Sequence, residues 1–465
     1  MQPLRVTISA LPDDVLLEIF KFYVDQIYPE DTWHTLVHVC RKWRYVVFAS
    51  PRWLRLELRC TNKSPVKKML DIWPALPIVI DAYITNSRRS GVANIIAALK
   101  RHDLVCRINI WGVPNSLLKS AAIKRRFSKL TDLTLRSNEE NAPAITDSFL
   151  SGSAPRLRSL QFRGIPFPFP ALGKLLLSTT DLVTLCLEDI PKSGIISPEQ
   201  IVTSLSALIK LQELFIDLRS PRSHADRERR HLPLLKRLVL PSLTHFYFKG
   251  DSEYLEGIVG SMDAPALKMV TITFFNQLVF NTPLLRDFFS RTVFQEPHQA
   301  DVSFNKPCIN LSFFRRKGTT YHGMLSVEIS SSVLEWQITS LAQFCSTCLP
   351  PLPTLERLVM HEFSSYWPEL PDDMDIAPWS ELLRSFVTVK DLVLSGDPLR
   401  GSNLHILRRL TGVPEVFPAL RHVFGRSLGI WGDNAPIQKV VAEFITARQL
   451  SGRPVVFSPV ETVSL

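Results

Sequence analysis

The first part of the chain has apolar residues at the spacing of an amphipathic helix. Pro12 suits a first helical position, where its missing N–H costs nothing, and the carboxylates of Asp13 and Asp14 complement the positive helix N-terminus. The apolar residues that follow lie three or four positions apart, which predicts one stripe on a helix. The stripe consists of Pro12, Val15, Leu16, Ile19, Phe20 and Tyr23.

A second helical pattern follows a polar, proline-containing connection at 25–31. It predicts one helix, antiparallel to the first, with its stripe at Leu36, Val37, Cys40, Trp43 and Val47. Ser50 and Pro51 then begin one more short turn, which carries Trp53. Such short helices bury too little surface to be stable alone, so the rest of the chain or a partner must cover their remaining apolar groups.

After residue 100, a short pattern recurs in which apolar residues occupy the first, fourth and sixth positions. Neighbouring units are mostly roughly 25 residues apart, which is the spacing of leucine-rich repeats. Each unit predicts a strand whose side chains alternately fill a stacked core and face a concave surface. The first apolar positions are Leu130, Leu157, Leu182, Leu211, Leu235, Leu243, Leu267, Leu355 and Val389.

Proline marks the same phase along the chain. It stands two residues before a first apolar position, where a missing donor is tolerated and a preceding helix must end. These prolines are Pro155, Pro233, Pro241, Pro265, Pro353 and Pro418.

Between the expected strands the sequence returns to helical spacing, which predicts an α/β fold with parallel strands joined through helices. Ser197 and Pro198 open one such helix, and the others are expected at 254–262, 284–290, 338–349, 379–386 and 437–447. Strand-like runs at 56–58, 78–83 and 107–111 leave no linker after the N-terminal helices, so we expect a rigid joint there. Most repeats lack the usual asparagine, and the expected solenoid is therefore curved but uneven.

Residues 274–352 are the least repetitive part of the chain. Alternating strand-like runs begin at Val302, Ile309 and Leu325. They fit either decayed repeats with longer loops or an inserted excursion, and we favour the decayed repeats. The tail at 452–465 is expected to form a terminal strand or to fray.

The composition is that of an ordinary globular protein. The chain has 465 residues, of which 45% are hydrophobic and 21% are charged, so it can bury a large core. No apolar run reaches the ~18 residues that span a bilayer, and residues 1–10 lack the pattern of a secretory signal. We therefore expect a soluble intracellular protein in the cytoplasm, the nucleus or both.

No pattern of a catalytic or metal site occurs in the sequence, and we expect neither enzyme activity nor a cofactor. The cysteines number seven and lie mostly in apolar runs, which is typical of reduced, packed thiols. Cys345 and Cys348 have the spacing of half a zinc site, but no second pair lies nearby, so core packing is favoured. The net charge is +10, but the basic clusters are short and scattered, so we do not expect nucleic-acid binding.

The N-terminal residues closely resemble the F-box motif. The first block is Leu11-Pro12-Asp13-Asp14-Val15-Leu16-Leu17-Glu18-Ile19-Phe20, and Val39-Cys40-Arg41-Lys42-Trp43-Arg44 and Trp53 follow it. In that family the motif binds a Skp-type adaptor, which links it to a cullin and a RING subunit, while the rest of the chain captures a protein substrate for ubiquitination. The adaptor-binding residues that the resemblance implies are Leu11, Pro12, Val15, Leu16, Ile19, Phe20, Val39, Cys40, Trp43, Val47 and Trp53.

The expected architecture is a small N-terminal helical F-box module at 7–54 and an irregular leucine-rich-repeat solenoid at 55–451. The resemblance implies a non-catalytic substrate-recognition subunit of an SCF-type (Skp-cullin-F-box) ubiquitin ligase, with an unknown protein substrate. Arginines that follow the strands, such as Arg136, Arg163 and Arg219, are candidate contacts to a modified substrate, although solubilising charge is the favoured interpretation.

The alternative is a leucine-rich-repeat interaction scaffold outside any ligase, whose N-terminal helices only cap the repeats. It predicts that Val15, Ile19 and Trp43 pack entirely against the first repeats and leave no exposed apolar patch. The ligase hypothesis requires that the N-terminal helices keep an apolar patch exposed to a partner.

Overall fold

The computed structural model describes residues 11–26, 32–85, 91–139, 142, 144–221, 237–292, 296–305, 308–318, 320–331, 333–362, 377–395, 416–426 and 435–459. The chain divides into two compact units, Met1–Ile195 and Ile196–Leu465, and each is a mixed α/β structure. The expected boundary at residue 54 therefore lies inside the first unit. Residues 7–10 of the expected F-box module, Leu235 and tail residues 460–465 lie outside the described residues.

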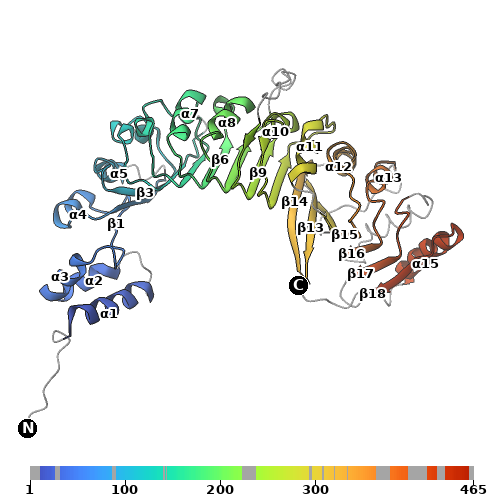
Figure 1. Ribbon diagram of the computed structural model, residues 1–465, viewed down its shortest axis with the longest axis horizontal. Coiled ribbons are helices and arrows are strands. Elements are labelled where there is room, and N and C mark those ends of the chain that lie inside the picture. The colour runs from blue at the N-terminus through green and yellow to red at the C-terminus, as the bar shows by residue number, and fades with distance from the viewer. Residues whose placement is uncertain are drawn as a thin grey trace, which may run out of the picture. The chain divides into compact units, whose positions relative to one another are not determined.

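The first unit begins with three helices and continues as a parallel sheet whose strands follow one another in chain order. Its helices are α1 (Asp13–Gln26), α2 (Thr32–Val39), α3 (Arg41–Ala49), α4 (Val66–Ile72), α5 (Val92–Leu99), α6 (Asn115–Leu118) and α7 (Phe169–Leu177). Its strands are β1 (Leu58–Cys60), β2 (Ile78–Tyr83), β3 (Val105–Trp111), β4 (Asp132–Arg136), β5 (Ser159–Arg163) and β6 (Thr184–Ile190). Helices α5 and α7 cover one side of this sheet (Figure 1).

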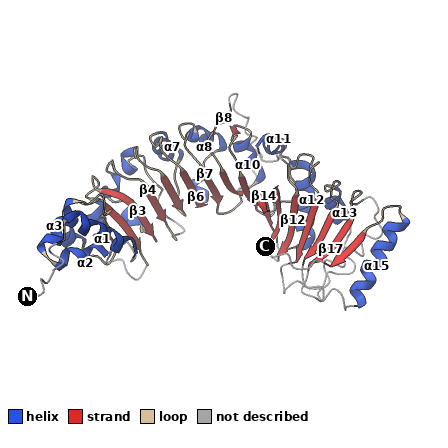
Figure 2. Ribbon diagram, turned by 60° about the horizontal axis from the view of Figure 1, so that its bottom comes forward, coloured by secondary structure: helices blue, strands red, loops and turns tan. Residues whose placement is uncertain are grey.

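The second unit repeats the alternation of helices and strands. Its helices are α8 (Pro198–Leu205), α10 (Ser252–Val259), α11 (Pro283–Thr292), α12 (Leu334–Cys348), α13 (Ala377–Arg384) and α15 (Ala435–Leu450). Its main strands are β7 (Glu213–Leu218), β9 (His245–Gly250), β11 (Met269–Phe274), β12 (Gln299–Asn305), β13 (Cys308–Lys317), β14 (Thr320–Ser330), β15 (Arg357–Glu362), β16 (Asp391–Ser395), β17 (His422–Arg426) and β18 (Val456–Pro459). The six helices expected in this part of the sequence are all confirmed, and Figure 2 shows helices along one side of the strands.

The repeats predicted from apolar spacing enter their strands through the same backbone turn. The N–H of the first apolar residue donates to the carbonyl three positions earlier, as from Leu157 to Ala154 at 3.0 Å. The next two N–H groups share a carbonyl of the preceding repeat, as Arg158 and Ser159 share that of Thr131 at 2.7 and 3.1 Å. The same bonds recur before β6, β9, β11, β16 and β17, and the turns before β9, β11 and β17 contain the proline that marks the phase in the sequence.

Alternation along each strand separates a helix-covered face from an open face. In β4, Leu133 and Leu135 are fully buried, while Asp132, Thr134 and Arg136 remain partly exposed. Because side chains alternate along a strand, the apolar positions of the repeats form the core and the intervening positions form the open face.

The favoured prediction that residues 274–352 are decayed repeats is wrong. The strand order here is β11-β14-β13-β12-β15, and β13 is antiparallel to both of its neighbours. After β11 the chain passes through α11 to β12, the strand of the meander that lies farthest from β11. Strands β13 and β14 then lead back, so that β14 lies beside β11. Helix α12 connects β14 to β15, which lies beside β12. Gly318, with φ at +63°, adopts the left-handed conformation that a tight turn between β13 and β14 requires.

Two smaller expectations are also corrected. The repeat assigned to Leu235 forms β8 (Leu238–Val239), which pairs only with β10 (Met262–Asp263) in a separate two-stranded sheet. The strand expected at 56–58 starts only at Leu58, because Arg55 has φ at +49° and the N–H of Leu56 bonds to the carbonyl of Pro51. The expected terminal strand is present as β18.

Candidate functional site

A small apolar core holds the three N-terminal helices together. Helix α1 starts at Asp13, one residue after the first helical position predicted at Pro12. Its inner stripe consists of Leu16, Phe20 and Val24, all of which are buried. Phe20 packs against Trp43 of α3 with 4.7 Å between the ring centroids. These contacts fix the orientation of α1 about its own axis.

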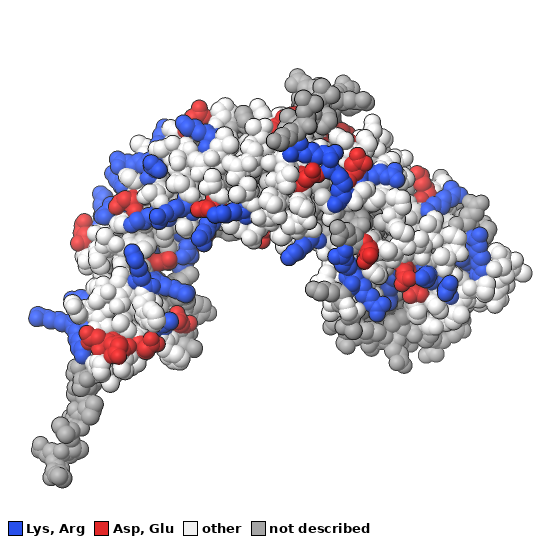
Figure 3. All heavy atoms as spheres, in the orientation of Figure 1, with Lys and Arg blue, Asp and Glu red and all other residues white. Residues whose placement is uncertain are grey.

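Helix α1 carries a second apolar stripe, which is exposed. Val15 and Ile19 are 39% and 42% exposed, and Phe22 is 68% exposed. These residues are spaced four and three positions apart, so they lie on one face of the helix. Acidic side chains gather over the same helix (Figure 3). A helix with apolar residues on two faces buries one in its own fold and leaves the other available to a partner.

The second helical segment is split in two at Cys40, which corrects the single helix expected over 36–47. Cys40 has φ at −157°, and its Sγ accepts a hydrogen bond from the N–H of Trp43 at 3.5 Å. It is therefore the N-cap of α3, a role in which a residue adopts extended backbone and its side chain accepts from the first turn.

Two lysines position the ends of this assembly. Lys42 Nζ donates to the carbonyl of Leu11 at 2.8 Å and lies 3.5 Å from a carboxylate oxygen of Asp13, which brings the start of α3 beside the start of α1. Lys21 Nζ lies over the ring of Trp53, 4.2 Å from its centroid. Trp53 is 50% exposed, so the turn after α3 adds a large apolar surface next to α1.

The residues that the F-box resemblance implies separate into an outer and an inner set. The outer set is exposed and consists of Pro12, Val15, Ile19, Val39, Cys40 and Trp53. Leu11 and Trp43 are partly exposed. The structure corrects the expectation for Leu16, Phe20 and Val47, because these are fully buried and present no surface to a partner.

Two exposed aromatic residues of these helices lie outside the stripes that the sequence predicts. Phe22 continues the outer stripe of α1, whereas the apolar spacing in the sequence predicts Tyr23 as the stripe residue at this turn. Its spacing from Val15 and Ile19 was the signal that could have found it. Tyr45 of α3 is exposed beside a shallow hollow of about 420 Å³, which is lined by Arg41, Arg44, Tyr45, Phe48 and Ala49.

The helices are joined to the sheet through an aromatic cluster. Trp33 of α2 is buried, and its Nε1 donates to the carbonyl of Glu57 at 3.1 Å, one residue before β1. Its ring lies 5.4 Å from that of Trp73, which follows α4, and the ring of Phe48 in α3 also contacts Trp73. The three helices and the first strands belong to one compact unit, and the rigidity of the joint between them stays a prediction.

The two closely spaced cysteines have the environment of core residues. Cys345 and Cys348 are buried in α12, and burial raises the pKa of both thiols, that of Cys348 to about 11. Cys348 Sγ lies 2.8 Å from the hydroxyl of Thr282. In the ranges that the structure describes, no group of three or more His, Cys, Asp or Glu side chains is arranged to hold a metal ion. Among the described helices, none is both long and apolar enough to cross a membrane.

Charged side chains are interspersed rather than segregated. On the face turned to the viewer in Figure 3, lysines and arginines alternate with acids over both units. One of the short basic clusters of the sequence, at 227–230, lies outside the described residues. This face therefore offers no continuous basic strip of the kind that tracks a nucleic-acid backbone.

A scan against protein-family models finds no match to this chain, and a search of curated proteins finds none either. The F-box resemblance consequently rests on the residues of the N-terminal helices themselves.

Proposed function

We propose that this chain is the substrate-recognition subunit of an SCF-type ubiquitin ligase. Its N-terminal helices bind a Skp-type adaptor, and the adaptor connects them to a cullin and a RING subunit. The rest of the chain captures a protein substrate. In this role the chain needs no catalytic group and supplies proximity and orientation, acting in the cytoplasm, the nucleus or both.

The exposed stripe of α1 is the observation that carries this proposal. Val15 and Ile19 belong to the residues of the F-box resemblance, and both keep about two-fifths of their surface in water. Trp53, the last residue of the resemblance, is half exposed beside the same helix. Aromatic and aliphatic side chains that move into a desolvated interface dominate binding energies, at about 2 kcal/mol or more for each anchor that is truncated.

The joint between the helices and the first strands suits a receptor that must present its substrate. Ubiquitin transfer in such a complex depends on holding the substrate at a fixed place relative to the adaptor. The hydrogen bond from Trp33 to Glu57 and the packing of Trp73 against α2 and α3 restrict motion at this joint. A substrate bound to the first strands would therefore be oriented relative to the adaptor.

We further propose that residues 55–451 form an irregular leucine-rich-repeat solenoid. Support comes from the backbone turn that recurs before successive strands and from the buried first apolar residues, such as Leu157 and Leu243. Parallel strands joined through helices are the usual content of such repeats. The meander of β12, β13 and β14 makes the proposed solenoid irregular.

The alternative of a repeat scaffold with a helical cap is less favoured. It requires Val15, Ile19 and Trp43 to pack entirely against the first repeats. Trp43 does pack inward, against Phe20, but Val15 and Ile19 do not. A cap of this kind would also gain nothing from a second apolar stripe, which lowers solubility.

The test is binding to a purified Skp-type adaptor in a pull-down with the full chain. Ile19→Asp would place an unpaired carboxylate in the interface, and we expect affinity to fall by at least ~100-fold. Leu177→Asp is the matched control, because Leu177 in α7 is an apolar residue of similar exposure, at 53%, that lies away from the N-terminal helices, and this variant should bind normally. The proposal is wrong if the wild-type chain binds no Skp-type adaptor or if Ile19→Asp binds as well as the control.

A further inference from the structure

The open face of the first unit carries a row of large side chains at the carboxyl ends of its strands. The strand registers pair Tyr83 with Trp111, Trp111 with Arg136, Arg136 with Arg163, and Arg163 with Glu188. The row therefore crosses β2, β3, β4, β5 and β6. Four strand spacings of about 4.8 Å give it a length of about 19 Å, which matches about six residues of extended peptide.

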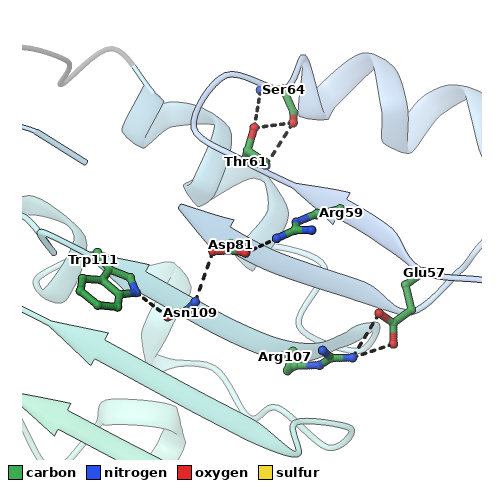
Figure 4. Close-up of polar contacts among 8 residues, drawn as sticks. All are labelled: Glu57, Arg59, Thr61, Ser64, Asp81, Arg107, Asn109 and Trp111. Atoms are coloured by element: carbon green, nitrogen blue, oxygen red, sulfur yellow. Dashed lines mark hydrogen bonds and ion pairs between the residues drawn. The ribbon is translucent and has the colours of Figure 1, made fainter. Parts of the chain in front are cut away.

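Trp111 is the fixed point of this row. A chain of polar contacts holds its ring: Nε1 donates to Oδ1 of Asn109 at 3.1 Å, and Nδ2 of Asn109 donates to Oδ1 of Asp81 at 3.3 Å (Figure 4). Asp81 is in turn held by an ion pair with Arg59. The indole is nevertheless 39% exposed, and Tyr83, 63% exposed, lies beside it with 6.4 Å between the ring centroids. An exposed aromatic side chain held in one orientation binds at low entropic cost.

Arg136 completes the exposed surface around this ring. Its Cζ lies over Trp111, 3.9 Å from the ring centroid, which is the geometry of a cation–π contact. Among the described residues, no carboxylate lies within ion-pair distance of Arg136. Stacking fixes the guanidinium while leaving its N–H groups able to bind a carboxylate with two parallel hydrogen bonds.

The unpaired positive charge of this face lies within the row, at the carboxyl ends of the strands. Toward the opposite ends of the strands, Arg59 pairs with Asp81, and Arg107 donates to both carboxylate oxygens of Glu57 at 3.0 and 3.2 Å (Figure 4). Those two arginines are neutralised within the fold. Arg163 has only a distant partner, with 4.0 Å separating its Nη1 from Oε2 of Glu188. Unneutralised charge therefore remains beside the two exposed aromatic rings.

We infer that this row binds an extended acidic peptide segment in which an aromatic or aliphatic residue stands next to aspartate or glutamate. The apolar residue packs on Trp111 and Tyr83, and the neighbouring carboxylate bonds to Arg136 and Arg163. A singly charged carboxylate fits better than a phosphate dianion, because Glu188 and Asp132 on the same face repel additional negative charge. The inference rests on the proposed substrate-receptor role, in which this peptide belongs to the substrate.

The probe is a set of fluorescein-labelled peptides of equal length. They share one Tyr-Leu centre and differ only in the flanking residues, which are glutamate, glutamine, lysine or phosphoserine. Fluorescence anisotropy measures their affinity for the full chain, for Arg136→Gln and for Trp111→Leu. The control variant is Arg125→Gln, which changes an exposed arginine in the connection between β3 and β4. Circular dichroism and adaptor binding verify that each variant is folded.

We expect the glutamate-flanked peptide to bind at least ~10-fold more tightly than the glutamine-flanked one. Arg136→Gln should abolish that preference, Trp111→Leu should weaken both peptides, and Arg125→Gln should change neither. Equal affinities for the glutamate and glutamine peptides, or an unchanged preference in Arg136→Gln, would overturn the inference. Tighter binding of the phosphoserine peptide would overturn the choice of carboxylate over phosphate.

Failure of this inference differs from failure of the proposed function. A chain that binds the adaptor but shows no preference for acidic peptides refutes the peptide site alone. A chain with the acidic preference but without adaptor binding refutes the ligase role and leaves the peptide site as a property of the sheet.

Discussion

Truncation of the two stripes of α1 should separate stability from binding. Phe20 belongs to the inner stripe and Ile19, its neighbour in the chain, to the outer one. Phe20→Ala removes a fully buried ring that packs against Trp43, whereas Ile19→Ala removes a side chain that is 42% exposed. The two substitutions change adjacent positions of one helix, so each serves as the control for the other.

The expected magnitudes follow from burial. Phe20→Ala should destabilise the three-helix assembly by about 3–5 kcal/mol, the usual cost of removing a buried phenylalanine. Ile19→Ala removes three carbons, worth about 2.4 kcal/mol if fully buried. Because nearly half of the side chain is exposed, and because alanine favours the helix, the net cost should be about 1 kcal/mol. The difference of at least about 2 kcal/mol corresponds to about 30-fold in the opening equilibrium.

Hydrogen exchange at the amides of α1 measures this difference locally, which matters because a chain with two compact units need not unfold in one step. Exchange in α1 should accelerate by at least ~30-fold more in Phe20→Ala than in Ile19→Ala. Adaptor affinity should fall in both variants, but in Ile19→Ala it should fall while exchange in α1 accelerates by only about fivefold. Equal acceleration in the two variants would refute the assignment of inner and outer stripes.

Three further substitutions test local features of the fold. Cys40→Ser should stabilise α3 by about 0.5–1 kcal/mol, because serine is a better N-cap than cysteine. Amide hydrogen exchange in α3 should therefore become slower. Gly112→Ala should lower the melting temperature, because Gly112 has φ at +71° and an added Cβ would lie 2.1 Å from the carbonyl oxygen of Ile84. Burial raises the pKa of Glu256 from 4.5 to about 7, so the folded chain binds its proton more tightly than the unfolded chain does. The stability from this group is thus present below pH 4.5 and is lost as the pH rises through about 7. Glu256→Gln should therefore make the melting temperature less dependent on pH over that interval.

Most of the strands could be predicted from local signals in the sequence. These signals are a short apolar pattern and, in many repeats, a proline two residues before its first apolar position. The strands after Pro155, Pro265 and Pro353 begin where that pattern places them. The meander could not be predicted in the same way. Antiparallel pairing of β13 depends on which distant strands meet, and the alternation in β12–β14 is the same for either direction.

The N-terminal helices show a similar limit. The apolar spacing predicts α1, but it places the inner and outer stripes in one stripe, because their residues are offset by only one position in the sequence. Leu16 of the inner stripe and Ile19 of the outer stripe therefore cannot be distinguished by spacing alone. Which stripe faces inward depends on the packing of Phe20 against Trp43, a contact between separate helices. The break at Cys40 was missed because cysteine is not among the usual N-cap residues.

Binding of a Skp-type adaptor should cover the outer stripe of α1. Hydroxyl-radical footprinting of the full chain with and without a Skp-type adaptor tests it directly, since oxidation reports the solvent exposure of each side chain. Oxidation of Val15, Ile19 and Trp53 should fall when the adaptor is added, while oxidation of Leu177 should stay unchanged. Unchanged oxidation of Ile19 and Trp53 in a saturated complex would contradict it.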